Sequence, residues 1–105
     1  MNLAEITIET AEPLVGTTFE IPLADGQTTT VKLDEVLPFA PSVRRPRRNA
    51  KVMRNPFSLY FLGSRSLILP QGMYTLRSDA TTIENIFLVP IGQDEEATEY
   101  EAVFT

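Results

Sequence analysis

The residues best suited to chemistry are those of Gly63-Ser64-Arg65-Ser66, where two hydroxyl groups flank a guanidinium after a glycine. Such a segment could form an anion-binding nest of backbone N–H groups, or supply a serine nucleophile. A nucleophilic serine needs a neighbouring base, and the sequence has no histidine, so Lys32 and Lys51 are the candidates that remain. We therefore expect a β-turn at this segment, no catalytic residues, and no enzymatic activity.

The acidic residues near the end of the sequence are the next candidates, as oxygen ligands for Ca²⁺ or Mg²⁺. They lack the ligand spacing of an EF-hand, and the sequence has neither cysteine nor histidine to bind a transition metal. We expect no metal site and no other cofactor, and regard the group as the natural counterpart of a basic surface. Its members are Asp94, Glu95, Glu96, Glu99 and Glu101.

The basic residues are concentrated in the stretch RRPRRNAKVMR, which holds six of the nine bases and no acid. The other 94 residues carry three bases and all fourteen acids, a net charge of −11. The cluster could bind a protein partner or a second copy of the chain, bind a polyanion, or be a solvated loop that complements the acidic body. Nucleic acid is less favoured, because aromatic residues that could stack on bases are sparse nearby. The cluster consists of Arg44, Arg45, Arg47, Arg48, Lys51 and Arg54.

Composition places these residues in a small soluble domain. The chain has 105 residues, of which 43% are hydrophobic, enough for one domain with a core of its own. No apolar run reaches the ~20 residues that a membrane-spanning helix needs, and the opening residues lack the pattern of a secretory signal, so we expect no membrane association. The absence of cysteine fits a reducing compartment and predicts a cytoplasmic location.

Alternation of apolar and polar residues with a period of two recurs along the chain, which is typical of β-strands with one buried face. Ile86–Ile91 is apolar on both faces, so it is expected to be the most buried strand, with Phe87 and Leu88 both in the core. The stretches with strand character are Thr17–Leu23, Thr28–Leu33, Phe57–Leu62, Ser66–Leu69, Met73–Arg77, Ile86–Ile91 and Glu99–Phe104. They predict an all-β fold, a small antiparallel barrel or half-open roll of about six strands, because closure removes unpaired edges.

Three connections punctuate these strands. Asp25-Gly26 predicts a hairpin turn, and Pro22, which has no N–H group, places the first strand at an edge or a bulge. Thr10–Gly16 resembles one short N-terminal helical turn, capped by Thr10 and ended by Gly16. Residues 37–55 combine three prolines with the six bases, and predict a long exposed loop within a single domain that spans residues 1–105.

Most aromatic residues fall on the apolar side of these patterns and are expected in the core. They are Phe19, Phe57, Phe61, Phe87, Tyr100 and Phe104. Tyr60 and Tyr74 have the opposite parity from Phe57, Phe61 and Met73 in their strands. An exposed tyrosine pair would indicate an interface, and a half-buried, hydrogen-bonded tyrosine is the alternative.

Core and turn motifs carry a family resemblance over most of the chain outside the basic cluster. They are Leu14-x-Gly16-x-x-Phe19, Phe57-Ser58-Leu59-x-Phe61, Gln71-Gly72-x-Tyr74-x-Leu76, Phe87-Leu88-Val89-Pro90-Ile91-Gly92 and Tyr100-Glu101-Ala102-Val103-Phe104. In these motifs the chain resembles a family of short bacterial proteins known only as a domain of unknown function. Some relatives in that family lie beside genes for phage-tail-fibre-like proteins, which implies an assembly or accessory role and supplies no catalytic or binding residues.

The sequence therefore predicts a non-catalytic protein-interaction, assembly or accessory domain of bacterial or phage-like type. Its partner would be another protein or a second copy of the chain, and the candidate contact residues are the six clustered bases together with Tyr60 and Tyr74. The alternative is a polyanion-binding module that uses the same bases, whose affinity would fall steeply with salt.

Overall fold

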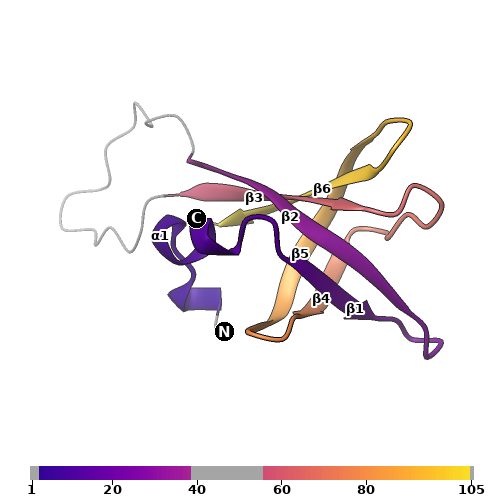
Figure 1. Cartoon of the computed structure of the whole chain (residues 1–105), viewed down its shortest axis with the longest axis horizontal. Coiled ribbons are helices and arrows are strands. Elements are labelled where there is room, and N and C mark those ends of the chain that lie inside the picture. The colour runs from indigo at the N-terminus through magenta and orange to yellow at the C-terminus, as the bar shows by residue number, and fades with distance from the viewer. Residues whose placement is uncertain (1–2, 39–55, 105) are drawn as a thin grey trace.

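The chain folds into a closed antiparallel β-barrel, seen from the side in Figure 1. A computed structural model describes residues 3–38 and 56–104. The strands in this part of the chain are β1 (Thr18–Pro22), β2 (Thr28–Pro38), β3 (Phe57–Gly63), β4 (Gly72–Arg77), β5 (Thr82–Gln93) and β6 (Thr98–Phe104). Around the barrel they follow the order β1-β2-β3-β6-β5-β4. The prediction of a small antiparallel barrel of about six strands is confirmed.

The barrel consists of two similar three-stranded meanders. Strands β1, β2 and β3 have 5, 11 and 7 residues, and β4, β5 and β6 have 6, 12 and 7. On one side the meanders join through β3 and β6, with seven residue pairs in register. On the other side β1 and β4 share a single registered pair, Glu20 with Arg77, so the two junctions that close the barrel are very unequal.

The long strand of each meander is bent by β-bulges. In β2 the register shifts between Leu33 and Glu35, opposite β3. Against β4, strand β5 has two outward residues between its inward Ile83 and Ile86, and Asn85 there has a positive φ of 59°. Bulges increase local twist and bend a strand, which is how a small sheet can curl far enough to close.

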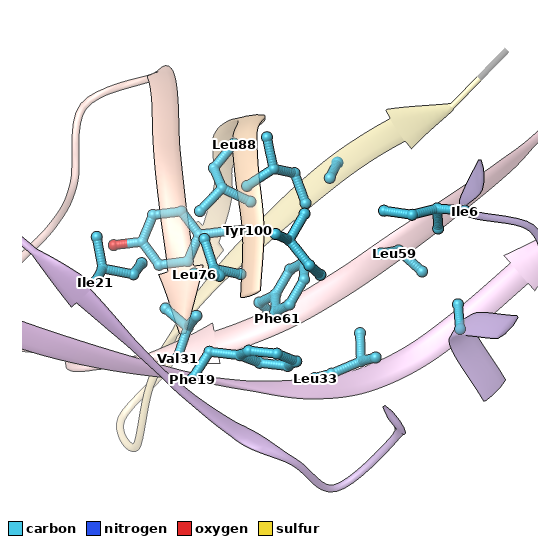
Figure 2. Packing of buried hydrophobic residues seen from close by; sticks show 14 of the residues in the cluster. Ile6, Phe19, Ile21, Val31, Leu33, Leu59, Phe61, Leu76, Leu88 and Tyr100 are labelled. Carbon is cyan, nitrogen blue, oxygen red and sulfur yellow. The ribbon is translucent and has the colours of Figure 1, made fainter. Parts of the chain in front are cut away.

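The interior is filled by buried apolar side chains from every strand. Figure 2 shows Phe19, Phe61 and Leu88 converging on the barrel axis. Phe19 and Phe61 meet edge to face with ring centroids 6.3 Å apart, and near the end of the barrel Phe57 stacks on Phe104 at 4.9 Å. The expectation that Leu59, Phe61, Leu88 and Phe104 share one core is confirmed. The buried apolar residues of this core, in order along the chain, are Ile6, Ala11, Phe19, Ile21, Val31, Leu33, Phe57, Leu59, Phe61, Leu69, Leu76, Ile83, Ile86, Leu88, Tyr100, Ala102 and Phe104.

A short helical segment precedes the barrel and contacts β2 and β5. It contains the 3₁₀ turn η1 (Leu3–Glu5), the helix α1 (Ile8–Ala11) and the 3₁₀ turn η2 (Glu12–Leu14). The helix begins earlier than predicted, because Thr7 rather than Thr10 is the N-cap. Thr7 Oγ1 accepts the Thr10 N–H, and Thr10 Oγ1 accepts the Thr7 N–H in return. Gly16 ends the segment at a φ of 92°, as the sequence predicts.

Two predicted boundaries are wrong. Ser66–Leu69 is not a strand but part of the irregular connection between β3 and β4, where the Leu69 N–H donates to the Tyr100 hydroxyl at 2.8 Å. The chain after Val36 does not leave the sheet, because β2 continues to Pro38 and pairs Leu37 with Ser58. The hairpin at Asp25-Gly26 is confirmed, with Gly26 at a φ of 86°.

Candidate interaction surface

The feature that distinguishes the outside of the barrel is a row of exposed apolar side chains across three adjacent strands. Met73 on β4 pairs with Phe87 on β5. The registered pairs of β5 and β6 end at Val89 and Glu101, and beyond that pair Phe87 and Val103 line one groove together. The exposed fractions are 60% for Met73, 47% for Phe87 and 52% for Val103. We call these three residues the apolar row.

The apolar row borders a shallow groove of about 220 Å³. Asn85, at the bulge of β5, and Leu3 of the N-terminal segment both contribute to its lining. Carbon-rich side chains dominate the lining, which consists of Leu3, Met73, Asn85, Ile86, Phe87, Ala102, Val103 and Phe104. A surface of this kind can hold an apolar side chain from another molecule.

Acidic residues follow the apolar row along β6. Glu101 and Glu99 have the same parity as Val103, so all three lie on the outer face, with the two glutamates half-buried. At the ~3.3 Å rise per strand residue, they lie roughly 7 and 13 Å from Val103 along the strand. The part of the chain that the structure describes carries three basic and fourteen acidic residues, so this surface belongs to a strongly anionic body.

Tyr60 belongs to this acidic part of the outer face. It lies on β3 between Glu35 on β2 and Glu101 on β6, each of which it pairs with in register. Its hydroxyl donates to Glu101 Oε2 at 2.8 Å. This bond to Glu101 raises the pKa of Tyr60, burial and the Glu101 and Glu99 charges raise it further, and the nearby Ser58 hydroxyl acts in the opposite direction. Tyr60 is therefore a neutral, fixed donor at neutral pH.

Tyr74 does not lie beside Tyr60, and both are half-buried and hydrogen-bonded, which is the alternative that the sequence left open to an exposed tyrosine pair. Tyr74 pairs with Ile86, packs against the core from inside the barrel, and donates its hydroxyl to the Pro70 carbonyl. Burial is the main cause that raises its pKa. Met73 takes the outward position instead, and β3 and β4 are not neighbours in the barrel.

The prediction that Phe87 is a core residue is also wrong. Strand β5 does alternate, with Ile86 and Leu88 buried and Phe87 exposed, and Ile91 is 45% exposed at a second bulge. Apolar residues on both faces indicate a strand covered on both sides, but a single-walled barrel covers only the inner face. The sequence does carry a signal for Val103: Tyr100, Ala102 and Phe104 share one predicted face, so Val103, which alternates with them, belongs on the opposite face.

Arg65 and Asp94, the candidates from the sequence for anion and metal binding, stabilise turns instead. In the turn after β3, the Arg65 Nε donates to the Asp94 carbonyl at 2.9 Å, and Gln93 Nε2 donates to the Arg65 carbonyl at 2.7 Å. The Asp94 carboxylate accepts the Glu96 and Ala97 N–H groups at 2.8 Å, and these two bonds lower the pKa of Asp94. Within the described ranges, no three acidic residues are grouped to hold a metal ion.

The predicted basic contact residues lie outside the described residues. These are Arg44, Arg45, Arg47, Arg48, Lys51 and Arg54. Across residues 3–38 and 56–104, no helix has the length and apolarity to cross a bilayer.

The fold and its outer surface define a small six-stranded barrel protein with an apolar and acidic exterior. The chain belongs to the family described as a domain of unknown function (DUF6916), which it matches over residues 6–104. This agrees with the expected membership of a family of that description. Neither the curated proteins nor the solved structures contain a match to the chain.

Proposed function

We propose that this barrel is a non-catalytic protein-interaction domain, an accessory or assembly component whose partner docks on the apolar row. The observation that carries the proposal is the placement of Met73, Phe87 and Val103 side by side on the outer face, each about half exposed. Single exposed apolar residues are ordinary on a protein surface, whereas a contiguous patch marks an interaction site. Methionine and phenylalanine are also enriched in protein interfaces.

The inside of the barrel supports this assignment to the outer face. Its strands contribute large side chains that are fully buried, Tyr100, Phe61 and Leu88 among them, so the interior is a packed core. The sequence has no histidine or cysteine, and Asp94 and Arg65 hold turns together. The resemblance to proteins encoded near phage-tail-fibre-like genes supports an assembly role of bacterial or phage-like type.

A polyanion ligand suits the described barrel poorly. Its three bases lie among fourteen acids, and a nucleic acid or a phosphate-rich surface would be repelled by that excess. The basic cluster could overcome this repulsion only through its own contacts, which salt would weaken steeply.

The test compares capture by three immobilised proteins from an extract of the cells that make the domain. They are the wild type, a Met73→Ser/Phe87→Ser variant, and an Ile68→Ser control, since Ile68 is 54% exposed but is not among the residues that line the groove. We expect at least one protein to bind the wild type and the control equally, and to be lost from the double variant. If all three capture the same set of proteins, the apolar row is not a docking surface and the proposal is wrong.

A further inference from the structure

We infer that the segment which docks on the apolar row is a cationic segment of a partner protein, with an apolar anchor flanked by Lys or Arg. This inference rests on the proposed function and adds the chemistry of the partner. The anchor would lie on Met73, Phe87 and Val103, and the cations would meet Glu101 and Glu99.

Glu101 lies among outer-face neighbours that carry no positive charge. On the outer face its neighbours are Val103 and Glu99 on its own strand, Val89 on β5, and Tyr60 on β3. Beyond Tyr60 in the same cross-strand row lies Glu35. This row therefore contains two carboxylates and no cation.

The hydrogen bond from Tyr60 leaves the charge of Glu101 in place. Tyr60 donates a neutral hydroxyl to the carboxylate at 2.8 Å, and the raised pKa of that hydroxyl keeps it protonated at neutral pH. The bond fixes the carboxylate without cancelling its charge. A half-buried, oriented carboxylate is a stronger site for an incoming guanidinium or ammonium group than one that is free to rotate.

None of the described bases lies in the cross-strand row of Glu101. Arg65 donates to the Asp94 carbonyl in a turn, and Arg77 lies opposite Glu20 where β4 meets β1. Lys32 on β2 lies in the row of Glu99, with Leu62 of β3 between them. Glu101 and Glu99 would complement a cation brought by a partner, because complementary potentials set which partners are accepted. The chain's own clustered bases, in residues 44–54, lie outside the described residues.

The same charges argue against the other occupants. In a symmetric contact between two copies centred on the apolar row, the same surface is present on both sides, so the described surface of each copy would bring Glu101 and Glu99 to the contact rather than a complementary cation. Each described barrel carries an excess of eleven negative charges, which also repels anionic lipid. A short cationic segment satisfies both the apolar and the acidic parts of this surface.

The spacing gives the partner a definite pattern. For an extended segment running along β6, the cations would lie roughly 7 and 13 Å from the apolar anchor, which corresponds to two and four residues. We therefore expect the docking motif to contain an apolar residue with Lys or Arg at the second and fourth positions from it.

The experiment selects peptides from a surface-displayed library of random 12-residue sequences, with the wild-type barrel as bait and the Met73→Ser/Phe87→Ser variant as counter-bait. We expect enriched peptides to be net positive, to carry the anchor-and-cation pattern, and to bind the counter-bait at least roughly tenfold more weakly, as expected when an interface anchor is lost. A Glu99→Gln/Glu101→Gln variant should bind them roughly two- to tenfold more weakly, as for two exposed ion pairs. The matched control, Glu9→Gln/Glu12→Gln, changes exposed acids on the N-terminal segment and should leave binding unchanged.

Several outcomes overturn the inference. The first is that the selected peptides depend on the apolar row but are neutral or acidic. The second is that their affinity is the same for the wild type and the Glu99→Gln/Glu101→Gln variant. The third is that no selected peptide depends on the apolar row. Sedimentation of the wild type and the Met73→Ser/Phe87→Ser variant identifies self-association, which would assign the surface to a second copy. The proposed function would stand without this inference if a cellular partner bound the wild type but not the Met73→Ser/Phe87→Ser variant, and docked through an acidic or neutral segment. Val103→Ser serves as a second row variant, and matching circular dichroism spectra verify that each variant is folded.

Discussion

The clearest test of the barrel architecture compares two neighbouring residues of β5. Leu88 is fully buried and Phe87 is 47% exposed, although both lie in the most apolar stretch of the sequence. Truncating Leu88 to alanine removes buried carbons and leaves a cavity, which costs about 2–5 kcal/mol of unfolding free energy. Truncating Phe87 removes a side chain that is worth up to ~3 kcal/mol when fully buried, and with half of it already in water the expected cost is about 1 kcal/mol.

Urea denaturation measures both values on the same scale. With an m-value of about 1.5 kcal/mol/M, Leu88→Ala should lower the unfolding midpoint by about 2 M, and Phe87→Ala by less than about 1 M. Both variants should keep the wild-type m-value, because neither changes the surface exposed on unfolding by much. Equal shifts, or a larger shift for Phe87→Ala, would mean that Phe87 faces the interior and that the register of β5 against β4 and β6 is wrong. That result would also remove Phe87 from the docking surface.

Three further predictions follow from local contacts. Gly63→Ala should lower the free energy of unfolding by about 1–3 kcal/mol, because an added Cβ would lie 3.0 Å from the Tyr100 ring. Thermal unfolding measures this loss, and a variant with the wild-type melting temperature would show that the contact relaxes without cost. Glu101→Gln should lower the pKa of Tyr60, measured by NMR titration of its ring, because it removes the carboxylate that accepts the Tyr60 hydroxyl. In the wild type this hydrogen bond contributes stability below the unfolded tyrosine pKa near 10, and that contribution is lost as pH rises through the raised folded pKa. An unchanged Tyr60 titration in the variant would contradict the hydrogen bond. The pKa of Asp94 is lowered, so its contribution to stability is present above the unfolded pKa of 3.8 and is lost as pH falls through the lower folded value. Asp94→Asn should therefore flatten the acid limb of the curve of stability against pH, and identical curves for the variant and the wild type would refute this.

The alternation of side chains predicted most of the barrel because it reports one buried face directly. Phe57, Leu59 and Phe61 alternate with polar or half-exposed neighbours, and the structure buries all three. The hairpin could be predicted for a similar local reason, since Asp25-Gly26 supplies a positive φ at the turn.

The faces of β4 and β5 required information that lies outside each strand. In Met73–Arg77 both parities begin with an apolar residue, and only the Leu76-Arg77 pair indicates that Tyr74 points inward. In β5, the bulge at Glu84 and Asn85 puts two consecutive residues on the outer face, which a strict period of two cannot represent. Bulges are fixed by the closure of the whole sheet, so a local pattern does not predict them.

The apolar row was missed for a related reason. Phe87 and Val103 lie in apolar stretches, and hydrophobicity alone assigns such residues to the core. Their exposure follows from strand order, because β4, β5 and β6 are covered on the inside only. The predicted candidates were instead charged or tyrosine residues, whose exposure a sequence indicates more directly.

The single registered pair between β1 and β4 has a consequence for how the barrel breathes. Separating Glu20 from Arg77 opens the ring there while β3 and β6 keep their seven pairs. Amide protons at the facing edges of β1 and β4 should then exchange with solvent through a local opening, and those between β3 and β6 only through global unfolding. The opened molecule is a curled sheet with two free edges, and free edges are templates for strand addition. Aggregation of this domain at high concentration should therefore begin at β1 and β4, from molecules that have kept nearly all of their native structure.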